Sequence, residues 1–243
     1  IFLLLFLLTL GLPLMSHTAA PYIDPATDTE HWGPADPSKT LFWTPAQQVA
    51  GYRNMEKISP ARRIPASTAP SILYEAPVGL SGVSFMQDGV EMTVDQYCAE
   101  GSVAGLIVLQ NGTVVYERYG LGNDQSTRWA SWSVAKSITS LLVGAAVHDG
   151  YIESIDEKVT AYLPRLKDSA YEGATIRNLL HMASGVEWNE DYVDPQSDVN
   201  SVPWGTLPLQ RYLRSRGAAA EPGTVFNYNT AETNLVGTLL RAA

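Results

Sequence analysis

A serine and a lysine stand three residues apart at the start of an apolar segment of this sequence. Ser133 and Lys136 lie within residues 129–148, where apolar side chains recur at helical spacing from Val134 onward. Side chains three apart share one face of a helix, so the Lys136 amine can take the proton of the Ser133 hydroxyl. Unpaired N–H groups of a first helical turn can hold an oxyanion. The spacing therefore indicates a serine nucleophile with a lysine base, and a chance motif with a solvated lysine is the alternative.

Histidine, the usual partner of a serine nucleophile, is poorly placed in this sequence. His148 falls on the same predicted helix as Lys136 but about 18 Å further along its axis. His181 follows a short predicted helix, where a structural histidine is the commoner case. The sequence also lacks a Gly-x-Ser-x-Gly motif. Lys136 is therefore favoured as the base over a Ser-His-Asp arrangement.

A second hydroxyl would complete a proton relay, and Tyr228 is the candidate. It lies just before Asn229, which with Glu232 resembles a capping box opening a helix over residues 231–243. A tyrosine packed in the core with its hydroxyl satisfied is the alternative. Sequence spacing alone does not decide between the two.

The elements that must position these residues include one clear β-hairpin at residues 105–119. Two β-branched runs flank Asn111-Gly112, the pair that a type I′ turn requires. Two strands alone are only marginally stable, so further strands or a helix must cover them. The helix after Ser133 can cover one face, and no further strand is evident downstream.

The segments on either side of the hairpin and the Ser133 helix are expected to be helical or irregular. Upstream, residues 21–77 hold nine of the 15 prolines and predict an irregular arm with short helical turns at 45–52. The other predicted segments are a short helix at 93–100, a helix at 176–183 capped by Thr175 and ended by Gly185, a polar loop at 187–208 and a helix at 208–214.

Composition and the single cysteine bound the class of protein. The chain is 45% hydrophobic and 17% charged, which is typical of a globular protein. Its formal charge of −9 argues against a nucleic-acid partner. Cys98 is the only cysteine, so no internal disulfide forms, and we expect a buried, inert thiol.

An acidic loop invites a metal interpretation that its spacing does not support. Asp191, Asp194 and Asp198 lack the Asp-x-Asp-x-Asp-Gly pattern of a calcium loop. A solvated loop is the better interpretation, so we predict no metal and no cofactor.

The first residues predict an export signal. Residues 1–15 are almost wholly apolar and residues 16–20 are mostly small, as in the apolar and cleavage regions of a secretory signal. The apolar run is short for a membrane span and is interrupted by Pro13. An uncleaved anchor is the alternative. We expect a periplasmic or secreted protein with no stable membrane span after cleavage.

The motifs in combination resemble those of the serine β-lactamase-related hydrolases, which include class C β-lactamases, DD-peptidases and esterases. The motifs are Ser133-Val-Ala-Lys136, residues 175–185 and Phe226-Asn-Tyr228. Residues 189–199 are similar to 6-aminohexanoate-dimer (nylon-oligomer) hydrolases in particular. The resemblance implies that Ser133 is acylated, that Lys136 is its base and that Tyr228 is the acid/base for the leaving group. It also implies that Tyr192 hydrogen-bonds a substrate amide.

The sequence departs from that family at two motifs. Where class C enzymes carry Tyr-x-Asn, this chain reads Tyr228-Asn-Thr230, so a hydroxyl replaces the amide that would contact a β-lactam side chain. The late Lys- or His-x-Gly motif is expected beyond Ala243, and the chain as given is expected to turn over poorly. Hydrolysis of esters or amides is therefore favoured over β-lactam hydrolysis.

These observations predict an α/β part plus an all-α region, with a β-lactamase/transpeptidase-like fold whose C-terminal part is missing. The expected organisation is a signal at 1–20, a proline-rich arm and short helix at 21–100, a hairpin and nucleophile helix at 101–149, and a helical region at 150–243. The predicted function is an exported serine hydrolase acting on small amides or esters. The alternatives are a penicillin-recognising sensor that acylates without turnover, and a β-lactamase or DD-peptidase.

Overall fold

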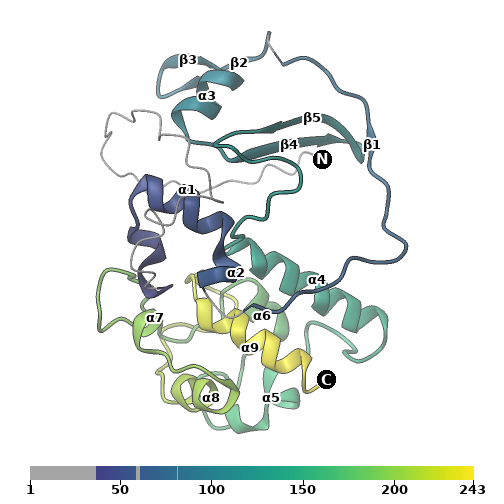
Figure 1. Ribbon diagram of the computed structural model, residues 1–243. Coiled ribbons are helices and arrows are strands. Elements are labelled where there is room, and N and C mark those ends of the chain that lie inside the picture. The colour runs from purple at the N-terminus through teal and green to yellow at the C-terminus, as the bar shows by residue number, and fades with distance from the viewer. Residues whose placement is uncertain (1–36, 59–60, 81) are drawn as a thin grey trace. The chain divides into compact units, whose positions relative to one another are not determined.

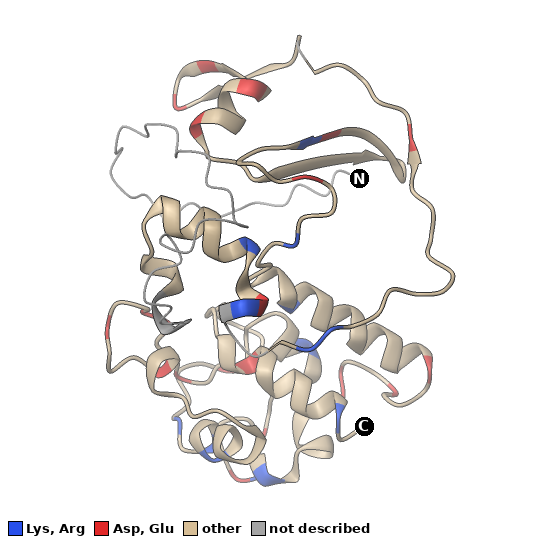
Figure 2. Cartoon of the chain, viewed as in Figure 1, with Lys and Arg blue, Asp and Glu red and all other residues tan. Residues whose placement is uncertain are grey.

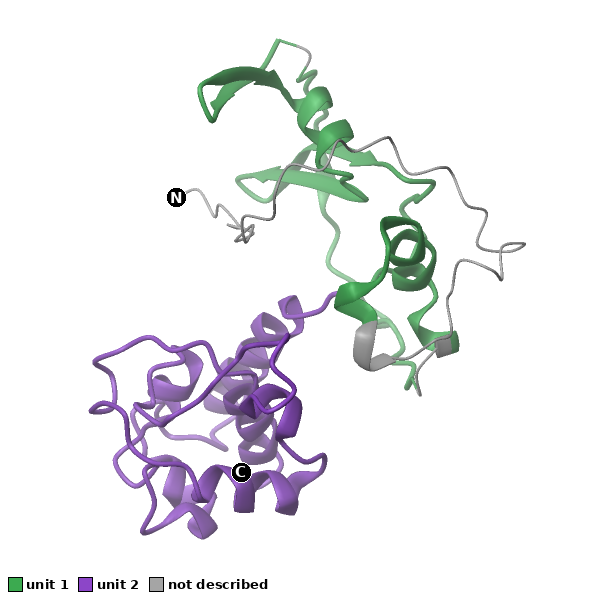
Figure 3. Cartoon of the chain, turned by 90° about the vertical axis from the view of Figure 1, so that its left-hand side faces the viewer, with its two compact units in different colours: residues 1–130 green, residues 131–243 purple. Residues whose placement is uncertain are grey.

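The computed structural model describes residues 37–58, 61–80 and 82–243 (Figure 1). Contacts divide the chain into two compact units, Ile1–Ala130 and Ser131–Ala243 (Figure 3). The predicted export signal at residues 1–20 and the first part of the proline-rich arm lie outside the described residues. None of the described helices has both the length and the apolar character needed to cross a membrane.

The predicted hairpin forms two of the three strands of the larger described sheet in unit 1. Strands β4 (Gly105–Gln110) and β5 (Thr113–Tyr119) are antiparallel. Asn111 and Gly112 both have positive φ, 52° and 78°, as the predicted type I′ turn requires.

A third strand in unit 1 lies within the segment that the sequence indicated to be irregular. Strand β1 (Tyr74–Glu75) pairs in parallel with β5, so that Tyr74 lies opposite Thr113. It is exposed and only two residues long, and Pro77 follows it closely, so no periodic pattern marks it. The expectation of an irregular arm throughout residues 21–77 was therefore wrong.

A second, small sheet also escaped the sequence analysis. Strands β2 (Ser84–Gln87) and β3 (Val90–Thr93) form an antiparallel hairpin joined at Asp88-Gly89. Helix α3 (Val94–Glu100) follows at the predicted place, with the Thr93 side chain accepting a hydrogen bond from the Gln96 N–H. Cys98 on this helix is buried, as predicted.

The helical turns predicted at residues 45–52 are confirmed as a regular helix that ends one residue later. A 3₁₀ segment, η1 (Pro37–Phe42), precedes α1 (Pro45–Arg53), and α2 (Met55–Ile58) follows. Thr44 caps α1, and proline at the first helical position loses no hydrogen bond. Trp43 stacks on Tyr52 with ring centroids 6.1 Å apart, and Gly51 leaves room for the Trp43 ring.

In unit 2, the predicted helix that follows Ser133 packs against the last helix of the chain. Helix α4 (Val134–His148) ends before Gly150, whose φ of 80° confirms the predicted left-handed position. It contacts α9 (Thr230–Leu240), and α9 also contacts α6 (Ile176–Leu180) and α8 (Thr206–Arg214). The core between these helices includes Val143, Leu179, Leu213 and Leu235.

Unit 2 buries only part of the apolar face that was predicted for α4. Val143 is the buried residue of this helix. Ile138 and Leu141 keep 55% and 68% of their surface exposed, so the other residues of unit 2 do not cover them. The prediction that α4 covers one face of the hairpin concerns the other unit and stays a prediction.

Several predicted boundaries in unit 2 were wrong. Helix α6 ends at Leu180 rather than at Ala183, because the chain turns at Met182, which has a φ of 51°. Gly185 does not end that helix. It lies so close to the backbone that a Cβ there would meet the Ala220 carbonyl oxygen at 2.1 Å.

The remaining elements of unit 2 are short. They are α5 (Val159–Tyr162), η2 (Pro164–Leu166) and α7 (Asp198–Ser201). Helix α7 and the first turn of α8 interrupt what was predicted as one loop over residues 187–208. The last helix ends at Leu240 and does not continue to Ala243.

Candidate active site

Ser133 lies at the boundary between an irregular turn and helix α4. It occupies the N-cap position with helical backbone angles, φ −66° and ψ −9°. The residue before it, Trp132, has a φ of 44°, which is uncommon for a bulky side chain. Backbone strain of this kind is concentrated at functional sites. Sequence reasoning did not single out Trp132, because no local pattern signals a positive φ at a tryptophan.

The three residues proposed from the sequence for the chemistry meet at one atom. The Lys136 Nζ donates to Ser133 Oγ over 2.9 Å, and the Tyr228 hydroxyl donates to the same oxygen over 2.8 Å. Lys136 Nζ also lies 5.0 Å from the centroid of the Tyr228 ring. Ser133 is exposed, whereas Lys136 and Tyr228 are half-buried. The serine oxygen is thus reachable and in contact with both groups that can move its proton.

Tyr228 is held in place by its two neighbours in the chain. The Asn227 N–H donates to the Met182 carbonyl over 2.8 Å, and its side chain donates to the Trp188 carbonyl over 3.1 Å. On the other side, the Asn229 side chain caps α9 by accepting the Glu232 N–H over 3.1 Å. These bonds hold the backbone on both sides of Tyr228, whose hydroxyl donates to Ser133 and not to a core group.

The Tyr192 side chain lies next to Thr230, the first residue of α9. Its hydroxyl donates to Glu190 Oε1 over 2.6 Å and lies 3.5 Å from Thr230 Oγ1. Burial and then the bond to Glu190 raise the pKa of Tyr192 to about 12. Within the described residues, no hydrogen bond joins Tyr192 to Ser133. The structure thus brings Tyr192 to the segment that carries Tyr228, but not into contact with the nucleophile.

Glu190 organises this corner of the site, and sequence reasoning passed over it. Its carboxylate accepts from the Thr230 N–H over 3.0 Å and from the Thr230 hydroxyl, the Tyr192 hydroxyl and the Trp188 indole N–H. Anions are favoured at a helix N-terminus, which is where α9 begins. A carboxylate between two aromatic residues in the 188–192 segment was the only local sign of this role.

A buried carboxyl lies one turn into the same helix. Glu232 is 1% exposed, and burial raises its pKa to about 8. The predicted capping box is only half present, because the Glu232 side chain accepts a hydrogen bond from the Ser184 hydroxyl instead of returning to the N-cap. Among the described side chains, Tyr171 OH, Asn229 Nδ2 and Glu232 Oε2 are buried without a hydrogen-bond partner.

The two histidines considered as bases are far from a catalytic arrangement. His148 is exposed in the last turn of α4, at the opposite end from Ser133. His181 is the exposed C-cap of α6, not a packed core residue as the sequence suggested. Neither donates to or accepts from Ser133 within the described part of the chain.

The three loop aspartates support backbone turns rather than a shared centre. Asp191 accepts the N–H of Val193, and Asp194 accepts the N–H of Gln196. Asp198 accepts from the Tyr212 hydroxyl and pairs with Arg216 on α8, as well as accepting the Asn189 N–H. The residues that the structure describes contain no group of three or more His, Cys, Asp or Glu that would hold a metal ion.

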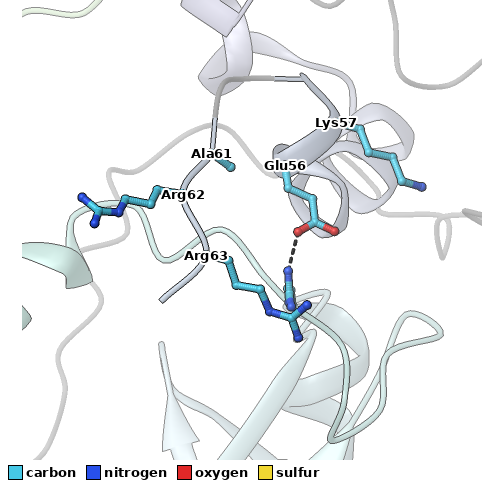
Figure 4. A pocket seen from close by; sticks show the side chains of 6 residues that line it. Glu56, Lys57, Ala61, Arg62 and Arg63 are labelled. Carbon is cyan, nitrogen blue, oxygen red and sulfur yellow. Dashed lines mark hydrogen bonds and ion pairs between the residues drawn. The ribbon is translucent and has the colours of Figure 1, made fainter. Parts of the chain in front are cut away.

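Unit 1 has a basic pocket of about 560 Å³ whose charges do not converge (Figure 4). Glu56 there pairs with Arg128. Figure 4 shows Lys57 and Arg62 pointing away to opposite sides, so these two cations do not bound a common binding point.

Comparison with known proteins assigns the family. Residues 90–243, well over half of the chain, match the model of the Beta-lactamase family. The chain therefore belongs to the beta-lactamase family, and its fold is of the β-lactamase/transpeptidase type, as the motifs predicted.

One known protein is similar in sequence over most of this chain. A 6-aminohexanoate-dimer hydrolase from Paenarthrobacter ureafaciens is 30% identical over 189 residues, which are 72% of this chain and 45% of that protein. The chain thus spans about half the length of this relative.

Two solved structures share the fold. A Bacillus anthracis protein assigned as a 6-aminohexanoate-dimer hydrolase has a TM-score of 0.66 and 20% identity, over 82% of this chain and 55% of that one. A Bacteroides dorei protein assigned as a beta-lactamase has a TM-score of 0.51 and 24% identity, over 62% and 44%. At these identities the likeness concerns the fold alone.

Proposed function

We propose that the protein is a serine hydrolase that cleaves small amides or esters through an acyl-enzyme on Ser133. The observation that carries the proposal is the double contact of Ser133 Oγ, 2.9 Å from Lys136 Nζ and 2.8 Å from the Tyr228 hydroxyl. A nucleophile beside a base and a second proton carrier is the arrangement that covalent catalysis requires.

The proton movements follow from these contacts. With Lys136 neutral, its Nζ takes the proton of the Ser133 hydroxyl as Oγ bonds to the substrate carbonyl carbon, and the π electron pair of the carbonyl moves to its oxygen. The tetrahedral intermediate collapses when Tyr228 protonates the leaving nitrogen or oxygen. The proton held by Lys136 restores the Tyr228 hydroxyl, and the acyl group stays on Ser133. Water then attacks the ester by the reverse route and releases the acid.

The nucleophile's own backbone is suited to stabilise the oxyanion. The Ser133 N–H makes no backbone hydrogen bond within the described residues, and it lies at the positive end of α4. A donor aimed at the developing negative charge typically contributes about 10²- to 10³-fold in turnover.

Amides are proposed as the preferred substrates. The similarity to a 6-aminohexanoate-dimer hydrolase supports this choice, and so does the position of Tyr192 beside Thr230, two residues from Tyr228. In the proposed complex Tyr192 hydrogen-bonds the substrate amide. Thr230, a hydroxyl where class C enzymes carry an amide, argues against β-lactams as the main substrates.

An active-site serine probe tests the proposal. A fluorophosphonate should label Ser133, as found by mass spectrometry, and both Ser133→Ala and Lys136→Ala should abolish labelling, because residues that act as one unit are not additive. His148→Ala is the control and should label normally. Esterase activity that persists in Ser133→Ala would refute the assignment. An ester substrate that acylates Ser133 without later release of the acid would favour a penicillin-recognising sensor instead.

We also propose that the protein is exported to the periplasm or beyond the cell. The apolar residues 1–15 and the small residues 16–20 support this. Cell fractionation and N-terminal sequencing of the mature chain test the proposal, and a protein retained in the cytoplasm with residues 1–20 intact would contradict it.

A further inference from the structure

One pocket of unit 2 brings three arginines together. It has a volume of about 280 Å³ and is lined by Arg165 of η2 and by Leu207, Gln210, Arg211 and Arg214 of α8. The four α8 residues are spaced i, i+3, i+4 and i+7, so they form one stripe along the helix. Figure 2 shows basic residues around α8 at the lower end of unit 2, and Figure 1 shows that end to be remote from the start of α4.

Within the described residues, the three guanidinium groups of Arg165, Arg211 and Arg214 form no ion pair. No acidic side chain lines the pocket, although the whole chain carries 25 acidic and only 16 basic residues. The pocket is therefore a local site of uncompensated positive charge on an acidic protein.

Arg214 is fixed in position without losing its charge. Its Nη1 donates to the carbonyl oxygens of Arg165, over 2.6 Å, and of Lys167. A guanidinium has five N–H donors, so others remain for a ligand. Because the side chain is already ordered, binding an anion costs less conformational entropy.

Gln210 offers this pocket a side-chain amide that the described residues do not use. It is only 5% exposed, yet its side-chain amide makes no hydrogen bond within the described part of the chain. The amide atoms are not among the buried side-chain polar atoms that lack a partner, so they keep contact with solvent at the pocket. Since Gln210 lines the same pocket as the arginines, a bound oxygen acceptor can accept from its N–H. Leu207, 47% exposed, adds an apolar wall.

We propose that this pocket binds a small organic carboxylate. Its oxygens accept hydrogen bonds from the arginines and from the Gln210 amide, and its carbon chain lies against Leu207. Guanidinium groups match the planar carboxylate with paired hydrogen bonds. The proposal does not depend on the chemistry at Ser133, because it is tested by binding and not by turnover.

Calorimetric titration of the full chain with glutarate tests the proposal. Glutarate should bind saturably and more weakly as salt rises, and the uncharged analogue glutaramide should not bind. Arg211→Gln should weaken glutarate binding about tenfold through loss of one charge-assisted contact, and Gln210→Leu should also weaken it. Arg241→Gln, which changes an exposed arginine beyond α9, is the matched control and should bind like the wild type.

Four results would overturn the proposal. They are the absence of saturable glutarate binding, unchanged affinity in Arg211→Gln, equal weakening in the Arg241→Gln control, and tighter binding of inorganic phosphate than of glutarate. If Gln210→Leu fails to fold, Arg211→Gln decides, because Arg211 is exposed and its replacement leaves the core intact.

Discussion

Replacing Glu232 by glutamine should flatten the dependence of stability on pH. In the folded state this carboxyl is 1% exposed and accepts a hydrogen bond from Ser184, and its burial raises its pKa from the ordinary 4.5 to about 8. Burial disfavours the charged form, and the single neutral hydroxyl does not replace the lost hydration.

The sign of the effect follows from where the proton is bound. Below about pH 4.5 Glu232 is protonated in both the folded and the unfolded chain. Between about 4.5 and about 8 the folded chain keeps the proton that the unfolded chain releases, so the free energy of unfolding falls as the pH rises. Above about pH 8 both states are ionised and the fall ends.

The size of the loss is on the order of 5 kcal/mol, because each tenfold difference in proton affinity corresponds to about 1.4 kcal/mol. Glutamine has nearly the same shape and stays neutral, so Glu232→Gln should be close to the wild type in mild acid and more stable by several kcal/mol in mild alkali. Tyr171 stays protonated over this range in both proteins, because burial, and after it the charge of Glu232, raise its pKa well above the ordinary value.

Urea unfolding at a series of pH values measures this effect. Glu153→Gln, at an exposed carboxylate of the same unit, is the matched control and should keep the wild-type slope of stability against pH. Equal slopes in the wild type and Glu232→Gln would refute the reasoning, because Glu232 would then titrate alike in the folded and unfolded states.

Three further outcomes are expected. Ser133→Ala should leave ester hydrolysis at background in a spectrophotometric assay, and residual wild-type turnover would contradict its role. Tyr192→Phe should lower amide hydrolysis about tenfold more than ester hydrolysis on matched substrates, since one hydrogen bond to the amide is lost; equal losses would indicate packing. Gly51→Ala should destabilise the protein by about 1–3 kcal/mol, because the new Cβ would come within 2.2 Å of the Trp43 ring. The helical control Gly144→Ala meets nothing within 4 Å and should stabilise by about 0.5–1 kcal/mol in thermal unfolding; a loss as large as that of Gly51→Ala would refute the steric argument.

The sequence alone predicted those features that depend on residues close together in the chain. The spacing of Ser133 and Lys136 on one helical turn predicts their contact, since a helix itself brings residues three apart together. The turn at Asn111-Gly112 follows from the tolerance of both residues for positive φ. The motifs also identified the family correctly.

The sequence did not predict where helix α6 ends or that strand β1 forms. Both depend on contacts with residues that are distant in the chain. Helix α6 ends early because residues 182–185 turn to meet backbone from other parts of unit 2, with Gly185 against Ala220 and the Met182 carbonyl accepting the Asn227 N–H. The two-residue strand β1 exists only because β5 offers it an edge. Such pairings carry no local periodicity.

In the candidate site, too, the sequence determined some features and the tertiary structure determined others. Composition and spacing indicated Ser133, Lys136 and Tyr228 as candidates, but Tyr228 lies 95 residues from Ser133, and no sequence rule states that their hydroxyls meet. The hydrogen bonds of Asn227 and Asn229, on either side of Tyr228, hold Tyr228 where its hydroxyl meets Ser133. The roles of Glu190 and Glu232 were likewise decided by tertiary structure alone, because the burial and hydrogen bonding of a carboxylate depend on which distant groups fold over it.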